Sequence, residues 1–434
     1  MNLLTLNDRP GLYPPSWYAA TAQNPGPFDP LDGETRADVC VIGAGFTGLS
    51  AALDLARGGL KVIVLEASRV GFGASGRNGG QAGSGHRLSQ RELVKLVGAE
   101  DALKLWTVAE DGKTLLRQRV TDHAPESLYT PGIVHAMWSA AGVQDEHDEA
   151  DFLATEYGYD QVEKLDEARL QAHVISHRFK GGVIDRGAGH IHPLRYAFGL
   201  VRACLEAGVT ICEMTEVDRI SGADRLIVQT SQGRVAASHV VLACNAYLGG
   251  LNRQVAARVM PINSFMAATE PLGLRRAGVL PGEAAVADSK WVVNYFRMSE
   301  DNRLLFGGSE GYGYRFPRDI AAQVRVPLEE VFPQLKDVKI DYAWGGSLAI
   351  TMSRLPYLAR PQPNIWSASG FSGHGVVLSG ITGRLIAKAI LGETEGFDLF
   401  ARIPSRRFPG GPALAAPLLR LAMTWYALRD RLGA

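Results

Sequence analysis

The chain lacks a surplus of charge of either sign. Lys and Arg together number 45, Asp and Glu also number 45, and the formal net charge at pH 7 is zero. A protein that binds nucleic acid electrostatically needs a basic surface, and so does one that adheres to an anionic membrane. The composition therefore argues against nucleic acid as a partner and against attachment to a membrane through charge.

Long apolar runs and a cleavable leader are also missing. No stretch reaches the roughly 18 apolar residues of a spanning helix, and residues 1–30 are polar and rich in proline. Only four cysteines occur, none in a C-x-x-C pair, so we expect reduced core residues and a cytoplasmic protein. The amphipathic segment Leu414–Leu432 is expected to pack on the protein itself rather than on a membrane.

The most informative pattern lies at Asp38–Glu66. An apolar run leads into Gly43-x-Gly45-x-x-Gly48, a helical pattern follows, and a second apolar run ends on Glu66. The glycines suit a tight turn, a close approach of the backbone to a pyrophosphate and a helix packed on its strand, while Glu66 is placed to accept hydrogen bonds from ribose. Free N–H groups at the helix start would face the phosphates. The pattern predicts a dinucleotide site but does not separate FAD from NAD.

A glycine-rich loop follows at Gly71–Gly85, with seven glycines in fifteen residues. This composition fits either a flexible linker or a backbone that follows the surface of a flat, polar ligand. Arg77, Asn78 and Gln81 favour the ligand, because linkers rarely need such side chains. The loop contains neither His nor Cys, which predicts a cofactor held without a covalent bond, although His86 just beyond the loop leaves this point open.

A second glycine-rich turn, at Gly370–Gly375, feeds an apolar segment with helical spacing. Such a helix would point its positive end at whatever lies over the turn, although an ordinary core helix has the same pattern. Gly380 and Gly383 suggest close packing between helices. Elsewhere, residues 89–120 have helical spacing broken at Gly98, and residues 146–173 read as a charged helical face. His190 and His192 lack partners at metal-ligand spacing, so we predict a turn and no metal site.

Further segments complete a recognisable series: AGHIHP (188–193), ACNAYLG (243–249), DNRLLFGG (301–308), FPQLKDVKIDYAW (332–344), SRLP (353–356), GFSGHGV (370–376), FPGG (408–411) and YALRDRLGA (426–434). With GFGASGRNGGQ (71–81), they make the chain from about residue 16 onward resemble the D-amino-acid oxidase-like family of FAD-dependent amine oxidoreductases. The resemblance implies an α/β FAD-binding Rossmann-type domain interleaved with an α+β substrate domain built on an antiparallel sheet.

The order of the elements predicts that the two domains alternate along the chain. The expected parts are an N-terminal arm (1–35), three FAD-binding parts (36–88, 176–254 and 346–400), two substrate-domain parts (89–175 and 255–345) and a C-terminal extension (401–434).

The motifs and the resemblance together imply a set of FAD-binding residues. They are Gly43, Gly45, Phe46, Thr47, Gly48, Glu66, Ala67, Ser68, Gly73, Ala74, Ser75, Arg77, Asn78, Gly79, Gly80, Gln81, Val217, Gly346, Gly370, Gly373, His374, Gly375 and Val376.

The catalytic candidates are His374, Arg354 and Tyr295. His374 sits in the glycine turn, where it would meet the flavin or the substrate, but a helix-capping role fits equally well. Arg354 would bind a carboxylate through two hydrogen bonds, with a structural salt bridge as the competing interpretation. Further substrate-binding candidates come from the expected substrate sheet: Tyr295, Arg297, Tyr312, Tyr314 and Arg315. Aromatic side chains among them would attract a cationic amine.

The resemblance implies oxidation of an amine to an imine by hydride transfer to flavin N5, then hydrolysis and reoxidation of the flavin by oxygen or another electron acceptor. The expected substrate is gamma-glutamylputrescine or a similar polyamine derivative. Alternatives are an oxidase or dehydrogenase of a secondary or cyclic amino acid (L-pipecolate, sarcosine) or of a D-amino acid, and a non-catalytic flavin-binding subunit. No oxygen-activating lysine stands out, and the sequence leaves the choice between oxidase and dehydrogenase, and the oligomeric state, open.

Overall fold

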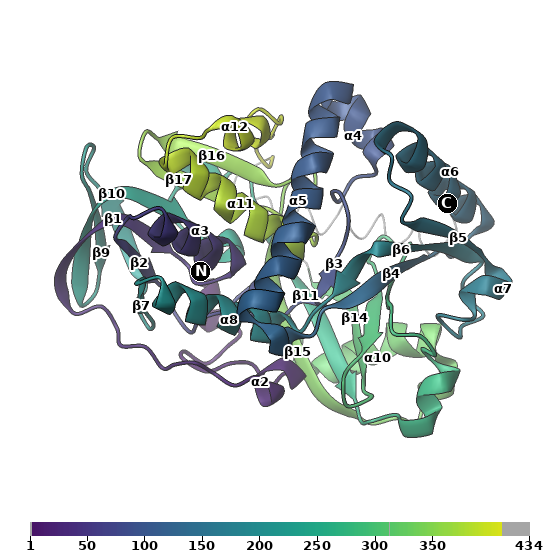
Figure 1. Ribbon diagram of the computed structural model, residues 1–434. Helices are drawn as coiled ribbons and strands as arrows, with labels where there is room; N and C mark the ends of the chain where they lie inside the picture. Colours follow the sequence, from purple (N-terminus) through teal and green to yellow (C-terminus); the bar gives the residue numbers. More distant parts are fainter. Residues whose placement is uncertain (1, 312, 410–434) are drawn as a thin grey trace.

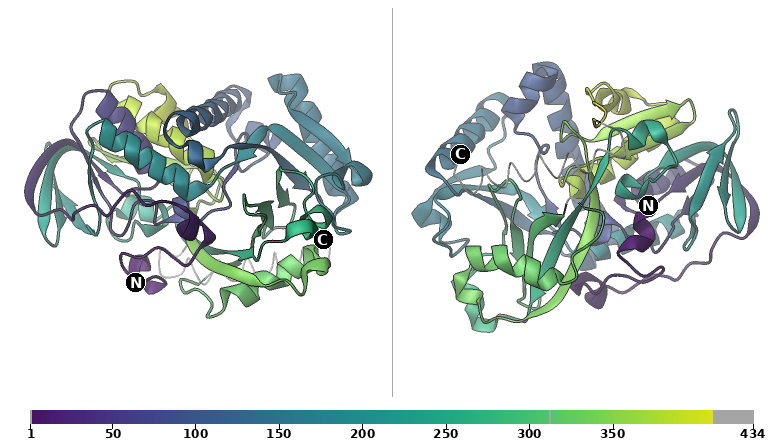
Figure 2. Two further views of the ribbon diagram at one scale, coloured as in Figure 1. Left: turned by 60° about the horizontal axis from the view of Figure 1, so that its bottom comes forward. Right: turned by 180° about the vertical axis from the view of Figure 1, so that it is seen from behind.

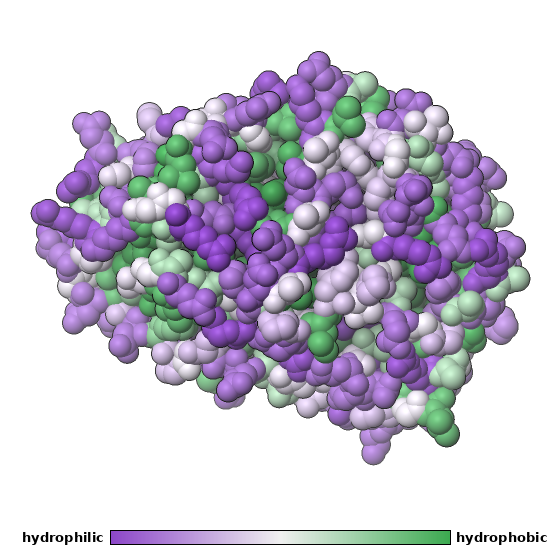
Figure 3. All heavy atoms as spheres, in the orientation of Figure 1, coloured by the Kyte–Doolittle hydropathy of each residue, from purple (hydrophilic) through white to green (hydrophobic). Residues whose placement is uncertain are grey.

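The computed structural model describes residues 2–311 and 313–409. Two lobes, each built on one sheet, lie side by side, and the long helix α5 (Ala99–His123) runs between them (Figure 1). Figure 2 shows the same division from two further directions. On the face drawn in Figure 3, hydrophilic residues cover most of the surface. The expectations for Tyr312, Leu414–Leu432 and the last motif at 426–434 fall outside the described residues.

The first lobe contains an eight-stranded sheet with a parallel centre. Along the sheet the strands are β16 (Tyr357–Gln362), β17 (Ile365–Ser369), β10 (Gly233–Leu242), β1 (Gly33–Ile42), β2 (Val62–Leu65) and β7 (Thr210–Cys212), with β9 (Leu226–Thr230) and β8 (Val217–Ser221) extending from β10. Side chains alternate across the sheet: Val39 and Val41 pack in one core, whereas Cys40 and Ile42 pack in another. Such two-sided burial is typical of parallel strands.

One face of this sheet is covered by helices. They are α3 (Phe46–Arg57), α8 (Pro193–Glu206), α11 (Gly375–Ile390) and the central helix α5, with α12 (Glu395–Ala401) beside them. The expected close packing is confirmed at Gly383, where a Cβ atom would come within 2.4 Å of the carbonyl oxygen of Thr47 on α3. At Gly380 the Cβ position has open space around it, but the Gly380 carbonyl accepts the Ser50 hydroxyl of α3 at 2.5 Å, so the two helices are close there as well.

The second lobe contains a nine-stranded sheet. Its strands are β15 (Ile340–Ile350), β11 (Met260–Thr269), β14 (Leu304–Gly311), β13 (Tyr295–Met298), β12 (Ala285–Asp288), β4 (Thr130–Ala136), β6 (Gly181–His190) and β3 (Gln81–Ala82), with β5 (Val162–Asp166) on β6. Neighbouring strands are antiparallel except β12 and β4, which run parallel. The expected fold class, an α/β lobe joined to an α+β lobe, is confirmed. The remaining helices include α1 (Leu3–Leu6), α2 (Trp17–Thr21), α4 (Gln90–Val97), α6 (Ala140–Tyr157), α7 (Glu167–Leu170), α9 (Arg253–Ala256) and α10 (Ile320–Val331).

Some segments lie where the sequence did not place them. β6, which falls in the part from residue 176 onward expected to bind FAD, pairs with β4 and β5 in the second sheet. Helix α5, expected with the substrate domain, packs against α8 and α11 of the first lobe. The helix expected over 146–173 ends at Tyr157, because Gly158 adopts the left-handed conformation (φ +61°) that stops a helix, and β5 follows. The break at Gly98 between α4 and α5 is confirmed.

Within the described ranges, no single helix is long and apolar enough to cross a membrane. Helices α11 and α12 meet the length and composition requirement only together, and the chain bends by 119° between them.

An ion-pair network joins the helices of the first lobe. Asp54 on α3 accepts hydrogen bonds from Arg119 on α5 (2.9 Å) and from Arg384 on α11 (2.8 Å). Arg119 also donates to the Ser50 hydroxyl at 2.5 Å, and only 3% of its side chain is exposed. The Asp54 carboxylate therefore balances a buried cation at the point where three helices meet.

We expect Asp54→Asn to destabilise the protein by about 3 kcal/mol, because removing one partner of a buried ion pair leaves the other charge uncompensated. Urea unfolding followed by circular dichroism would measure the change. The control is Glu100→Gln, which breaks an ion pair with Lys104 on the exposed side of α5 and should leave the unfolding midpoint unchanged. Equal midpoints for the two variants would contradict this account of Asp54.

Candidate functional site

A cavity of about 1150 Å³ lies between the two sheets. Residues of the first sheet line one part of it, among them Glu66 after β2 and Val217 on β8, and residues of the second sheet line another, among them Tyr295 on β13 and Gly346 on β15. A cavity that draws on both lobes can hold a long ligand with one end on each.

The predicted glycine turn lies at the wall of this cavity. Gly43 has φ +105°, and its N–H donates to the carbonyl of Leu65 at 2.8 Å, so the turn is closed against β2. A Cβ atom on Gly48 would come within 1.9 Å of the Gly43 carbonyl oxygen, and one on Gly45 within 2.8 Å of the Ser75 hydroxyl oxygen. Only glycine fits at Gly48, a side chain at Gly45 would displace the Ser75 hydroxyl, and the bare backbone at Gly43 and Gly45 lines the cavity.

The start of α3 differs from the expectation in one detail. The Phe46 N–H, predicted to be free for a phosphate, donates to the Ser75 hydroxyl oxygen at 2.9 Å. Phe46, Thr47 and Ser75 nevertheless all line the cavity. The Ser75 hydroxyl therefore stands between the helix terminus and the ligand space, joining the glycine loop to the glycine turn.

Glu66 lies at the carboxyl end of β2 and lines the cavity. One carboxylate oxygen accepts the Ala44 N–H at 2.8 Å and the other accepts the Ser68 N–H at 2.9 Å. Burial raises the pKa of this carboxyl to about 7, against the lowering effect of these backbone hydrogen bonds. Each oxygen can still accept a hydroxyl hydrogen bond, so Glu66 both shapes the turn and offers acceptors to a ribose.

Two polar side chains of the glycine loop, Asn78 and Arg77, hold it in shape. The Asn78 amide donates to the carbonyls of Ala74 and Ser75, both at 2.9 Å, and its oxygen accepts the Gly80 N–H at 2.8 Å. Arg77 donates to the Phe72 carbonyl, to both oxygens of Asp8 and to the Gly345 carbonyl. One terminal nitrogen of Arg77, Nη2, is buried without a partner among the described residues. The loop is an ordered part of the site and not a linker.

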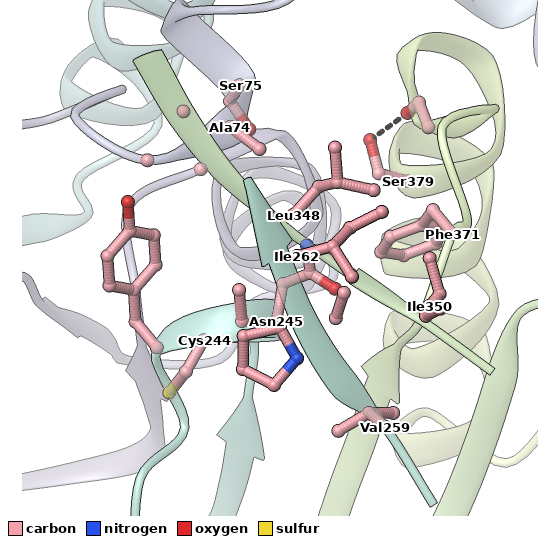
Figure 4. A pocket seen from close by; sticks show the side chains of 18 of the residues that line it. Ala74, Ser75, Cys244, Asn245, Val259, Ile262, Leu348, Ile350, Phe371 and Ser379 are labelled. Atoms are coloured by element: carbon pink, nitrogen blue, oxygen red, sulfur yellow. Dashed lines mark hydrogen bonds between the residues drawn. The ribbon is translucent and has the colours of Figure 1, made fainter. Parts of the chain in front are cut away.

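Several residues that were not among the predicted site residues complete the middle of the cavity. Figure 4 shows Ile262, Leu348 and Phe371 turned toward one another, between the loop that carries Ala74 and helix α11. Ile262 and Leu348 are direct partners on β11 and β15. Asn245, at the end of β10, accepts the Gly370 N–H at 3.0 Å. Ile262 and Leu348 lie in no motif, so only the pairing of β11 with β15 identifies them, whereas Phe371 and Asn245 lie within the motifs at 370–376 and 243–249.

Helix α11 begins at the cavity. Gly375 and Val376 in its first turn line it, as does His374, the residue that precedes the helix. Burial, and then the nearby His86, lower the pKa of His374 to about 3, so its imidazole is neutral at physiological pH. Its Nε2 is buried without a partner among the described residues. A neutral ring in this position can donate or accept one hydrogen bond but cannot supply a positive charge.

Tyr295 and Arg354 also line the cavity. The Tyr295 ring lies so close to Gly79 and Gly307 that a Cβ atom on either would fall within 2.6 Å of it, and its hydroxyl is 3.1 Å from that of Ser264. Arg354 follows β15, has φ +61°, and lies over the Trp291 ring at 5.2 Å. The structural salt bridge considered for Arg354 is not formed with any residue that the structure describes.

The remaining candidates take different positions relative to the cavity. Tyr314 lines the cavity but Arg315 does not. Arg297 is buried and donates to the carbonyls of Gly79 (3.0 Å) and Ile191 (3.1 Å), so it supports the loop from behind. His192 caps α8, accepting the Arg195 N–H at 3.2 Å. No group of three His, Cys, Asp or Glu side chains in residues 2–311 and 313–409 is arranged to hold a metal.

Most of the predicted cofactor residues meet at the cavity. Those that line it are Gly43, Gly45, Phe46, Thr47, Glu66, Ala67, Gly73, Ala74, Ser75, Arg77, Asn78, Gly79, Gln81, Val217, Gly346, Gly373, His374, Gly375 and Val376. Four predicted residues do not line the cavity: Gly48, Ser68, Gly80 and Gly370. They stabilise the turns next to it, through backbone hydrogen bonds at Ser68, Gly80 and Gly370 and through close backbone packing at Gly48. The backbone cradle, the Glu66 acceptors and the unpartnered nitrogens of Arg77 and His374 fit a dinucleotide with a polar ring system.

Comparison with known proteins gives the same assignment. The family described as FAD dependent oxidoreductase, DAO, matches residues 38–389. A probable oxidoreductase, OrdL, of Rhizobium meliloti is 40% identical over 419 residues, covering 96% of this chain and 97% of that protein. Gamma-glutamylputrescine oxidoreductase of Escherichia coli is 39% identical over 420 residues, covering 96% and 98%.

The fold comparison agrees with the sequence comparison. The crystal structure of glycine oxidase from Geobacillus kaustophilus superposes with a TM-score of 0.71 at 21% identity, covering 86% of this chain and 99% of that one. The chain therefore belongs to the DAO family of FAD-dependent oxidoreductases and is an enzyme of amine or amino-acid substrates that uses FAD.

Proposed function

We propose that the protein oxidises the terminal amine of gamma-glutamylputrescine or a similar polyamine derivative. The observation that carries this proposal is a single cavity that joins the predicted dinucleotide cradle, at Gly43 and Glu66, to a polar region with Arg354 and Tyr295. A substrate with an amine at one end and a carboxylate at the other suits such a cavity. The name of the Escherichia coli relative supports the same substrate class.

The chain's own residues bind, orient and exclude water in this scheme. Bound FAD would supply the acceptor for the hydride that leaves the carbon next to the amine. Tyr295 presents an aromatic wall to the substrate, and burial raises its pKa to about 12, so its hydroxyl remains protonated. Ile262, Leu348 and Phe371 keep the middle of the cavity apolar, which strengthens the polar interactions inside it. The neutral His374 contributes one hydrogen bond at the start of α11.

FAD is held without a covalent bond in this proposal. His86, the residue that left this point open, does not line the cavity, and its Nε2 lies 3.0 Å from the Leu105 carbonyl oxygen. Cys244 does line the cavity, but burial raises its thiol pKa to about 12, so the thiol is a poor nucleophile. We also infer a reducing compartment, the cytoplasm, because the four cysteines are free.

Anaerobic mixing of the flavin-loaded protein with gamma-glutamylputrescine, putrescine, L-pipecolate and sarcosine tests the proposal. Fastest bleaching of the flavin absorbance by gamma-glutamylputrescine supports it. Faster bleaching by L-pipecolate or sarcosine would assign the protein to secondary or cyclic amino acids instead. No bleaching by any of them would favour a non-catalytic flavin-binding subunit. Reoxidation with oxygen, compared with an artificial acceptor, separates oxidase from dehydrogenase, and acid precipitation reports whether the flavin is released.

The pKa of Glu66 predicts a pH dependence of FAD binding. In the folded protein without FAD, the Glu66 carboxyl keeps its proton up to pH about 7, whereas its ordinary pKa is 4.5. Between pH 4.5 and 7 the unfolded chain therefore loses this proton more readily than the folded protein, and the burial of Glu66 lowers the stability increasingly as the pH rises. Ribose hydroxyls donate to the ionised form, so FAD should bind the apoprotein about tenfold more tightly at pH 8 than at pH 6. Quenching of flavin fluorescence measures the dissociation constant. Glu66→Gln cannot ionise and should flatten the profile, and the same slope in both proteins would exclude Glu66 as its cause.

Arg354 predicts a separate effect on the substrate. Because a buried hydrogen bond to a charged group typically contributes a few kcal/mol, Arg354→Ala should raise the apparent dissociation constant of gamma-glutamylputrescine by about a hundredfold. The flavin content should not change. Arg318→Ala is the control, since Arg318 is exposed and does not line the cavity. Loss of flavin from the Arg354 variant, with unchanged substrate affinity, would contradict a role in substrate binding.

A further inference from the structure

Two guanidinium groups at the cavity have no acceptor among the residues that the structure describes. Arg87 and Arg354 both line the cavity. Within the described residues, neither side chain donates a hydrogen bond or forms an ion pair, and Arg354 only lies over the Trp291 ring. Buried arginines elsewhere in the protein behave differently: Arg77, Arg119 and Arg297 all donate to protein oxygens. Unused donors on two adjacent arginines are suited to an anion that enters the cavity.

Arg87 lines the cavity and keeps a large accessible surface. Protein atoms surround the cavity, so the guanidinium group is partly desolvated although it is accessible. Burial, and then the charge of Arg354, lower the pKa of Arg87, whereas Glu310 raises it. All three side chains line the same cavity, and Arg354 and Glu310 both act electrostatically on Arg87.

Each of these groups comes from a different part of the chain. Arg87 follows the glycine loop, and Arg354 follows β15 with a left-handed backbone. Glu310 lies near the end of β14, and it too lines the cavity. A charged cluster assembled from three separate segments on the side of the second sheet is a property of the folded cavity and not of a local sequence motif.

We propose that Arg87, Arg354 and Glu310 form a subsite for the ammonium-carboxylate head of an α-amino acid. The two arginines bind the carboxylate, and Glu310 accepts the α-ammonium group. The inference rests on the proposed function and narrows it: the substrate is an amine joined to an amino acid whose own amino and carboxyl groups are both free. A ligand with a carboxylate alone would be attracted by the arginines but repelled by Glu310.

Three substrates that share one amine distinguish these contributions. Gamma-glutamylputrescine has the full head group, glutarylputrescine lacks only the α-ammonium group, and butyrylputrescine lacks both charges. Gamma-glutamylbutylamide retains the head but has no terminal amine to oxidise, so its binding can be measured at equilibrium by calorimetry. Flavin reduction by butyrylputrescine reports the amine chemistry independently of the head group.

For the wild-type protein, we expect affinity to fall at least tenfold from gamma-glutamylputrescine to glutarylputrescine. Arg87→Gln should weaken the binding of gamma-glutamylbutylamide by about 10- to 100-fold, which is the scale for the loss of a charged hydrogen-bond partner. Flavin reduction by butyrylputrescine should not change. Glu310→Gln should change the affinities for the two carboxylate-bearing substrates in opposite directions. The affinity for gamma-glutamylputrescine should fall, and the affinity for glutarylputrescine should rise. Arg318→Gln serves as the control and should change none of them.

The outcomes separate this inference from the proposed function. The subsite assignment is wrong if Arg87→Gln weakens the binding of all three substrates equally, or if Glu310→Gln weakens the binding of both carboxylate-bearing substrates. The proposed amine oxidation would stand in either case. If no substrate reduces the flavin of the wild-type protein, the proposed function fails, and tight binding of gamma-glutamylbutylamide that depends on Arg87 would still support the subsite. Flavin content and the unfolding midpoint of each variant confirm that it has folded.

Discussion

The site depends on the buried guanidinium group of Arg77. It joins the N-terminal arm at Asp8, the glycine loop at Phe72 and the second sheet at Gly345, with only 2% of its side chain exposed. Hydrogen bonds to charged groups are stronger than neutral ones, and a buried cation fixes its acceptors in place. Through this one side chain, the loop that shapes the cavity is held between both lobes.

Glycine determines how closely the parts of the first lobe approach one another. The turn at Gly43 closes because Gly48 has no side chain, and α11 lies on α3 because Gly383 has none. These contacts bring α11, from the C-terminal part of the chain, to the same cavity as the turn that begins α3. Residues separated by more than three hundred positions in the sequence thus form one wall, and the close approach of the α3 and α11 backbones is accompanied by the ion pair between Asp54 and Arg384.

Features of the fold and the site could be predicted from the sequence where the interacting residues are close in the chain, and could not where they are distant. The glycine turn, Glu66 and the helix from Gly375 could be predicted because strand, turn and helix are encoded within about 30 residues. The sheet that contains β6 could not, because an apolar strand carries no mark of its partners. Arg87 and Glu310 were missed for the same reason: single charged residues acquire meaning only when β14 and the glycine loop meet. Arg297 was a candidate for the substrate site, but its donors are used by the carbonyls of Gly79 and Ile191.

The backbone of Arg354 has a consequence for how the protein can change. A left-handed conformation at a residue with a side chain costs of order 1 kcal/mol that glycine would not incur. Replacement by glycine would relieve this strain and at the same time remove the guanidinium group from the cavity. Selection for a more stable fold and selection for recognition of the ligand therefore oppose each other at this position, and a more heat-resistant variant found by random mutation could be one that binds its substrate poorly.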